Sequence, residues 1–170
     1  KFNLQNEKAP AFILDVKLRV EKMGWNDANQ GITTYQIDGK IVDLIENYGL
    51  IPMREIATQS KPWYEHTGAK VSQRAAQNNA QMFEMLMNSL LVSAKEQIAV
   101  YKDEYMLSDA NTPAKLVGNG AALYKVVMRL TTLDTKSTNK ALRDRLKELP
   151  TVAATLNGDI DAIHAYFNDT

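Results

Sequence analysis

The fold class follows from the stretch Val71-Ser72-Gln73-Arg74-Ala75-Ala76-Gln77, which continues through Met82-Phe83-Glu84-Met85-Leu86-Met87 to Leu90-Leu91 and on to Tyr105. No Gly or Pro interrupts it, and its commonest residues have a low energetic cost in a helix. Apolar side chains recur at three- and four-residue steps, which places them on one face. The pattern predicts a long amphipathic helix over residues 71–105, with a break near Ser93. Such a helix needs other helices packed against its apolar face.

Similar patterns predict shorter helices on both sides of this stretch. They are expected at residues 11–23, 40–48, 53–59, 121–130, 135–149 and 160–167. Gly24 and Gly49 are expected to end the first two of these helices. Residues 32–37 contain the β-branched side chains of a short strand, but no partner segment is evident after Asp38-Gly39. The fold class expected from the residues is therefore all-α, a helical bundle.

One linker is expected to divide the chain. Residues 108–112 are mostly small or polar and Pro113 closes them, a composition typical of a connection between two units. This places an N-terminal helical lobe at residues 1–112 and a C-terminal helical segment at residues 113–170. The second segment is short for an independent hydrophobic core.

Composition excludes several classes of function. Lys plus Arg and Asp plus Glu each total 20, so no net charge draws the protein towards nucleic acid or a membrane surface. The absence of cysteine excludes disulfides and thiolate metal sites. No apolar run approaches the roughly 18 residues of a membrane span, and the first residues lack a signal-peptide pattern. We therefore expect no membrane partner.

The residues show no catalytic constellation. The two histidines, His66 and His164, lie far apart, and neither has a companion at metal-ligand spacing. Gly118-Asn119-Gly120 lacks the Lys-Ser/Thr pair that ends a phosphate-binding loop, and it is interpreted as a turn. We expect no enzyme activity, no cofactor, no metal and no small-molecule substrate. A small enzyme with its site at one of the histidines stays open as an alternative.

Two groups of residues are candidates for contacts with partners. Trp25, Trp63 and Tyr64 are aromatic residues near expected helix ends, where they either hold a ligand or stack on a base, or pack inside the fold. Basic residues gather between Lys115 and Lys147, where they either meet phosphate or form one solvated helix face. The candidates for nucleic-acid contact are Lys125, Arg129, Lys136, Lys140, Arg143, Arg145 and Lys147.

The last third of the chain carries a pattern that runs from Ala122 to Leu130, continues at residues 133–138 and 142–146, and ends near Tyr166-Phe167. This pattern resembles the Gag polyproteins of copia-type LTR retrotransposons, particularly the divergent lineages of algae such as diatoms. Residues 77–89 and Met23-Gly24-Trp25 are similar to upstream parts of that family. The chain lacks the family's Cys-x-x-Cys-type zinc knuckle and stops where the last capsid helices would continue, as expected of an excised capsid fragment.

The resemblance implies a structural capsid subunit that self-assembles into a shell around the element's RNA, in an intracellular, cytoplasmic particle. It implies two small helical lobes as in retroviral-type capsid proteins, with residues 113–170 forming a truncated second lobe. It also implies that the aromatic candidates lie at interfaces between copies, and that the basic candidates face packaged RNA through non-specific phosphate contacts. The alternative is a helical protein-interaction or nucleic-acid-binding module with no assembly role.

Overall fold

The computed structural model describes residues 1–27, 31–64, 70–108, 116–132, 147 and 150. The chain divides into two compact units, Lys1–Thr132 and Leu133–Thr170, and the elements described below belong to the first. This unit extends past the boundary expected at residue 112. The physical reason is that residues 116–118 pair with an earlier strand and that the helix after them is buried in the same core.

The first unit is mostly helical. A 3-10 turn, η1 (Asn6–Lys8), leads into α1 (Ala9–Met23), and α2 (Leu44–Asn47), α3 (Met53–Tyr64), α4 (Lys70–Ser89), α5 (Val92–Ala99) and α6 (Lys102–Tyr105) follow. Two antiparallel hairpins pair β1 (Thr34–Ile37) with β2 (Lys40–Asp43) and β3 (Met106–Ser108) with β4 (Leu116–Gly118). A further helix has its described residues at 120–132. The expected all-α class thus holds in a coarse form, as a mostly helical fold with short strands.

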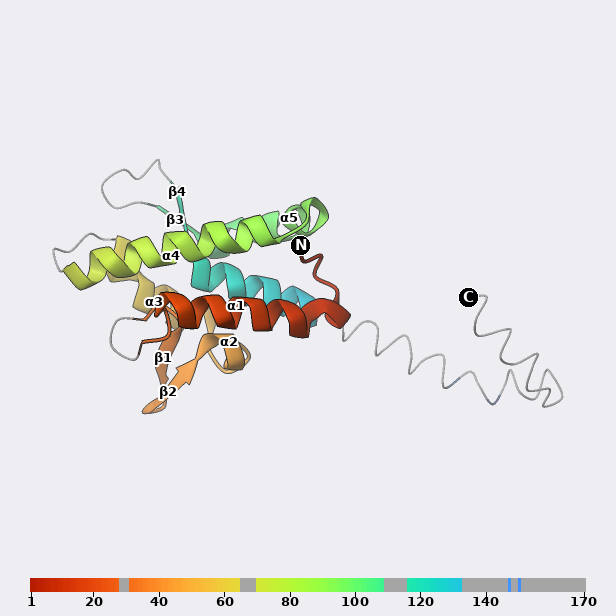
Figure 1. Ribbon diagram of the computed structural model, residues 1–170, viewed down its shortest axis with the longest axis horizontal. Coiled ribbons are helices and arrows are strands. Elements are labelled where there is room, and N and C mark those ends of the chain that lie inside the picture. The colour runs from red at the N-terminus through yellow and green to blue at the C-terminus, as the bar shows by residue number, and fades with distance from the viewer. Residues whose placement is uncertain (28–30, 65–69, 109–115, 133–146, 148–149, 151–170) are drawn as a thin grey trace. The chain divides into compact units, whose positions relative to one another are not determined.

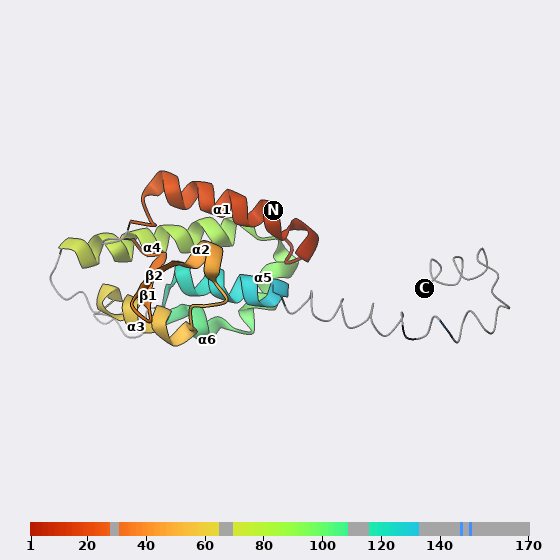
Figure 2. The ribbon, with the colours of Figure 1, turned by 90° about the horizontal axis from the view of Figure 1, so that it is seen from below.

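The helix at residues 120–132 lies within the helical group, next to α4 (Figures 1 and 2). Residues 121–124 and 126–128 are all buried, and this explains why the helix is apolar over most of its circumference, with Lys125 and Arg129 as its half-buried charged residues. The helix predicted at residues 121–130 is confirmed. Those predicted at 135–149 and 160–167 lie outside the described residues, apart from Lys147.

The long helix predicted over residues 71–105 is interrupted, at a point slightly earlier than Ser93. The N-terminal segment inserts where α4 ends. There the Phe2 amide donates to Ser89 O at 2.7 Å, and the Leu91 amide donates to Phe2 O at 2.9 Å. Phe2 and Leu90 form an isolated parallel bridge there. The carbonyl of Phe2 thus accepts from the Leu91 amide after the end of α4, and the chain restarts as α5 (Val92–Ala99) after the extended residue Leu91.

The helix predicted over residues 40–48 is wrong in its first half. Residues 40–43 form β2, and Asp38 and Gly39 make the tight turn of a hairpin, with φ of 49° and 77°. Left-handed φ at both central residues is the geometry that suits a two-residue hairpin. Asp43 then begins α2 by accepting hydrogen bonds from the amides of Ile45 at 2.7 Å and Glu46 at 3.2 Å.

Candidate interaction surface

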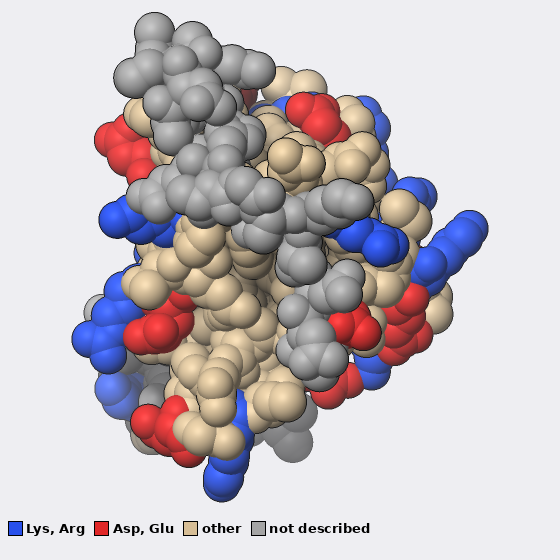
Figure 3. Space-filling view, turned by 90° about the vertical axis from the view of Figure 1, so that its left-hand side faces the viewer, with Lys and Arg blue, Asp and Glu red and all other residues tan. Residues whose placement is uncertain are grey.

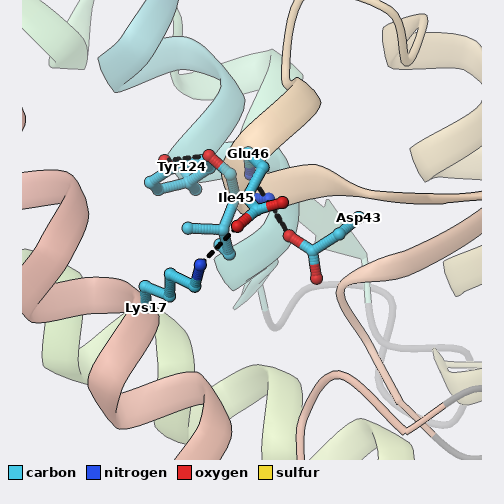
Figure 4. Close-up of polar contacts among 5 residues, drawn as sticks. All are labelled: Lys17, Asp43, Ile45, Glu46 and Tyr124. Carbon is cyan, nitrogen blue, oxygen red and sulfur yellow. Dashed lines mark hydrogen bonds and ion pairs between the residues drawn. The ribbon is translucent and has the colours of Figure 1, made fainter.

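The short helix α2 is held in place by contacts from two other helices (Figure 4). On one side the Lys17 ammonium of α1 donates to the Glu46 carboxylate, and this hydrogen bond raises the pKa of Lys17. On the other side the Tyr124 hydroxyl donates to Ile45 O at 2.9 Å. Burial raises the pKa of that phenol. A helix of four residues has little stability of its own, so these contacts define its position.

Lys125 and Arg129, the two described members of the basic group in this unit, are engaged inside the fold. The Lys125 ammonium donates to Tyr48 O, and burial lowers the pKa of Lys125. Arg129 forms two hydrogen bonds with the Glu104 carboxylate, of 2.9 and 2.7 Å, which raise the pKa of Arg129. Its guanidinium also lies over the Tyr101 ring, 4.8 Å from the centroid. Their positive charge is therefore directed towards the protein.

The other basic candidates belong to the second unit. Lys147 is exposed there, and the remaining four lie outside the described residues: Lys136, Lys140, Arg143 and Arg145. On the face shown in Figure 3, Lys and Arg alternate with Asp and Glu around an uncharged middle. The described part of that face therefore presents charges of both signs, and not a continuous basic area.

Two of the three aromatic interface candidates are core residues. Trp25 is 2% exposed and Trp63 is 8% exposed. Gly24 ends α1 in the left-handed conformation, and the Trp25 amide donates back to Val20 O at 2.9 Å, so the chain reverses and the indole is buried. Both tryptophans are buried as expected of packing anchors, and neither offers an exposed ring to a partner in this structure. The side chain of Tyr64, and His66, lie outside the described residues.

A buried polar junction at Gly118-Asn119-Gly120 was not expected from the sequence. The Asn119 Oδ1 atom accepts from Ala122 N and from Asn79 Nδ2, both at 3.1 Å, while its Nδ2 donates to Ser60 Oγ at 2.9 Å. Asn79 Oδ1 in turn accepts from Ala121 N at 3.1 Å. The first turn of the buried helix is thus capped from its own chain and from α4. The only feature of the sequence that could have indicated this cap is an Asn placed just before an apolar helix.

Exposed apolar side chains gather on two described helices. On α1, Leu14 and Leu18 are 56% and 55% exposed and lie one helical turn apart. On the α5 segment, Val92 and Val100 are 71% and 80% exposed. Spacing of this kind places each pair on one face of its helix, so that each face is partly apolar. Such faces are typical of contacts with other proteins.

A groove of about 610 Å³ lies between the N-terminal segment, α1 and α4. Its floor contains the stacked rings of Phe2 and Phe12, whose centroids are 4.3 Å apart, together with Met85. A smaller hollow of about 220 Å³ between α1 and α2 is lined mainly by polar and acidic side chains. Within the described residues, no group of three or more His, Asp or Glu side chains is placed to hold a metal ion.

Comparisons with protein-family models, with curated proteins and with solved structures find no match for this chain. None of the described helices combines the length and the apolar character that a membrane span requires. The surfaces of the first unit and the sequence resemblance therefore provide the basis for a proposed function.

Proposed function

We propose that the chain is a structural, Gag-like capsid subunit of an LTR retrotransposon, which self-assembles into a shell enclosing the element's RNA. The observation that carries the proposal is the exposure of paired apolar side chains on α1 and on the α5 segment. Many weak contacts between identical copies are sufficient to close a shell, because symmetry repeats each contact. The Gag-like pattern of the last third of the chain supports the same function.

Self-association is the property to test first. The experiment measures the mass distribution of the purified protein by light scattering as concentration and salt are varied, with electron microscopy of the heaviest fraction. We expect oligomers that grow with concentration and regular particles among the largest. The double variant Leu14→Gln/Leu18→Gln should shift the distribution to smaller species, because it removes apolar area from α1 and keeps good helix formers.

The matched control is Ile41→Gln on β2, since Ile41 is 66% exposed and lies on a different element. It should leave the mass distribution unchanged if α1 carries the contact. A protein that stays monomeric at the highest concentration and binds RNA with a steep salt dependence would contradict the capsid function. That result would favour the alternative, a nucleic-acid-binding module with no assembly role.

A further inference from the structure

The outward face of the α5 segment carries an apolar–acidic–apolar stripe. Val92, Glu96 and Val100 follow one another at four-residue steps, and Val100 still has helical φ and ψ of −61° and −26°. All three are exposed, whereas Ala94 and Ile98 on the same helix are fully buried. Helix geometry places Glu96 opposite these buried residues, so the stripe points directly away from the core.

The groove beside α1 has the complementary character. Its floor is apolar, and Lys8 and Arg19 of its lining are exposed cations that form no ion pair with the described residues. Lys1 adds a third cation, and Asp15 is the single acidic residue of the lining. The exposed Leu18 forms part of the same lining. An apolar floor beside unpaired cations suits a segment that offers small apolar side chains and a carboxylate.

We infer that the groove of one copy receives the Val92–Glu96–Val100 stripe of a second copy, an inference that rests on the proposed self-assembly. In this contact the two valines cover the Phe2–Phe12 floor and Leu18, and the Glu96 carboxylate meets Arg19. The groove holds about 610 Å³, which is enough for a few side chains of one helix face. The contact is therefore small and weak by itself.

Groove and stripe are different surfaces of one chain. A contact that joins the groove of one copy to the stripe of the next is heterologous, and it leaves a free groove at one end and a free stripe at the other. Repetition of such a contact builds rings or open lattices and does not stop at a dimer. A shell subunit needs a contact that allows this continued addition of copies.

Charge reversal tests the contact. Arg19→Glu in the groove and Glu96→Lys in the stripe should each weaken self-association of the full chain about tenfold or more, because like charges then face each other. An equimolar mixture of the two variants should recover association, since the intact stripe of one fits the intact groove of the other. The double variant R19E/E96K should also recover, because the pair is restored with exchanged signs. Sedimentation velocity across concentration measures all four.

Lys40→Glu on the β1–β2 hairpin is the matched control, as it makes the same charge change on an exposed residue outside the groove. It should associate like the wild-type protein, and circular dichroism should show every variant folded. Two results would overturn this contact while leaving self-assembly intact. In the first, R19E and E96K both associate like the wild-type protein. In the second, both variants are weakened, but neither their mixture nor the double variant recovers association. A wild-type protein that is monomeric at all concentrations would overturn both.

Discussion

The side-chain Nδ2 atom of Asn79 on α4 donates to the Oδ1 atom of Asn119 at 3.1 Å, and this hydrogen bond joins residues that are 40 positions apart in the sequence. Both side chains are buried. Through Asn119 the junction also reaches Ser60 of α3, whose hydroxyl donates to Ile56 O at 2.6 Å. One small polar group therefore connects α3, α4 and the buried helix at residues 120–132.

Asn119→Ala should lower the free energy of unfolding by about 3 kcal/mol. The change removes the cap of a buried helix, worth about 1 kcal/mol, and leaves buried donors without partners, at about 1–3 kcal/mol. Urea denaturation followed by circular dichroism measures the loss. The control is Asn88→Ala, because Asn88 is exposed on α4. A loss below about 0.5 kcal/mol for Asn119→Ala would show that the junction does not stabilise the fold.

Gly120→Ala should destabilise the protein by about 1–3 kcal/mol or more, because an added Cβ would lie 2.6 Å from Phe83 N and 2.7 Å from Asn79 O. These are backbone atoms of α4, which cannot move aside cheaply. Gly49→Ala is the matched control, since a Cβ there meets nothing within 4 Å. Thermal denaturation should give a clearly lower melting temperature for Gly120→Ala than for Gly49→Ala. Equal melting temperatures would contradict the close approach of the helix at residues 120–132 to α4.

Tyr124→Phe should change how stability depends on alkaline pH. Burial raises the pKa of Tyr124 in the folded state above its ordinary value of 10.0. The folded state therefore holds the phenolic proton more tightly, and this contribution is fully present below about pH 10 and is lost as pH rises through the folded-state pKa. The free energy of unfolding of the wild-type protein should fall above about pH 10, and Tyr124→Phe should reduce that fall.

At neutral pH the same variant should lose about 1–2 kcal/mol, because Ile45 O is left without the hydroxyl that donates to it. Guanidinium titrations at neutral and alkaline pH measure both effects. Tyr101→Phe serves as the control, because that ring is only half-buried. An alkaline fall of equal size in wild-type and Tyr124→Phe proteins would assign the pH dependence to other groups.

Phe2→Ala should cost about 3–5 kcal/mol, the usual loss for a truncated core phenylalanine. Phe2 is 4% exposed and stacks on Phe12, and its backbone separates α4 from α5. Chemical denaturation compares it with Leu18→Ala, which truncates an exposed residue and should change stability by less than about 0.5 kcal/mol. Equal stabilities of the two variants would show that the N-terminal segment does not contribute to the core.

RNA affinity should depend on the basic residues after Thr132 and not on Arg129. Glutamine substitutions at Lys136, Lys140, Arg143, Arg145 and Lys147 should weaken binding of single-stranded RNA and reduce the salt slope by about 0.7 for each phosphate that is no longer neutralised. Fluorescence anisotropy across salt concentrations measures the slope. Arg129→Gln should instead lower stability by roughly 1 kcal/mol, since its partly exposed ion pair with Glu104 is removed. A reduced salt slope in Arg129→Gln would contradict this assignment.

Local signals in the sequence were sufficient for much of the helical structure. Three- and four-residue apolar spacing predicted α1, α4 and the helix at residues 120–132, and Gly24 ends α1 as expected. These features depend on residues within one or two turns of each other, so the sequence of a short window determines them. The largely apolar composition of residues 121–128, interrupted by Lys125, also reflects a helix that is buried over most of its surface.

The tertiary structure alone decided the features that depend on distant residues. The helix α4 ends at Ser89 because Phe2 inserts there, and residues 40–43 are a strand because they pair with β1. Lys125 and Arg129 face the protein because Tyr48 and Glu104 are close to them in space. A hydrogen bond between distant residues leaves no periodic trace in either segment. Local patterns therefore identified α1, α4 and the helix at residues 120–132, whereas tertiary contacts decided where helices break, that residues 40–43 form a strand, and which side chains are held inside the fold.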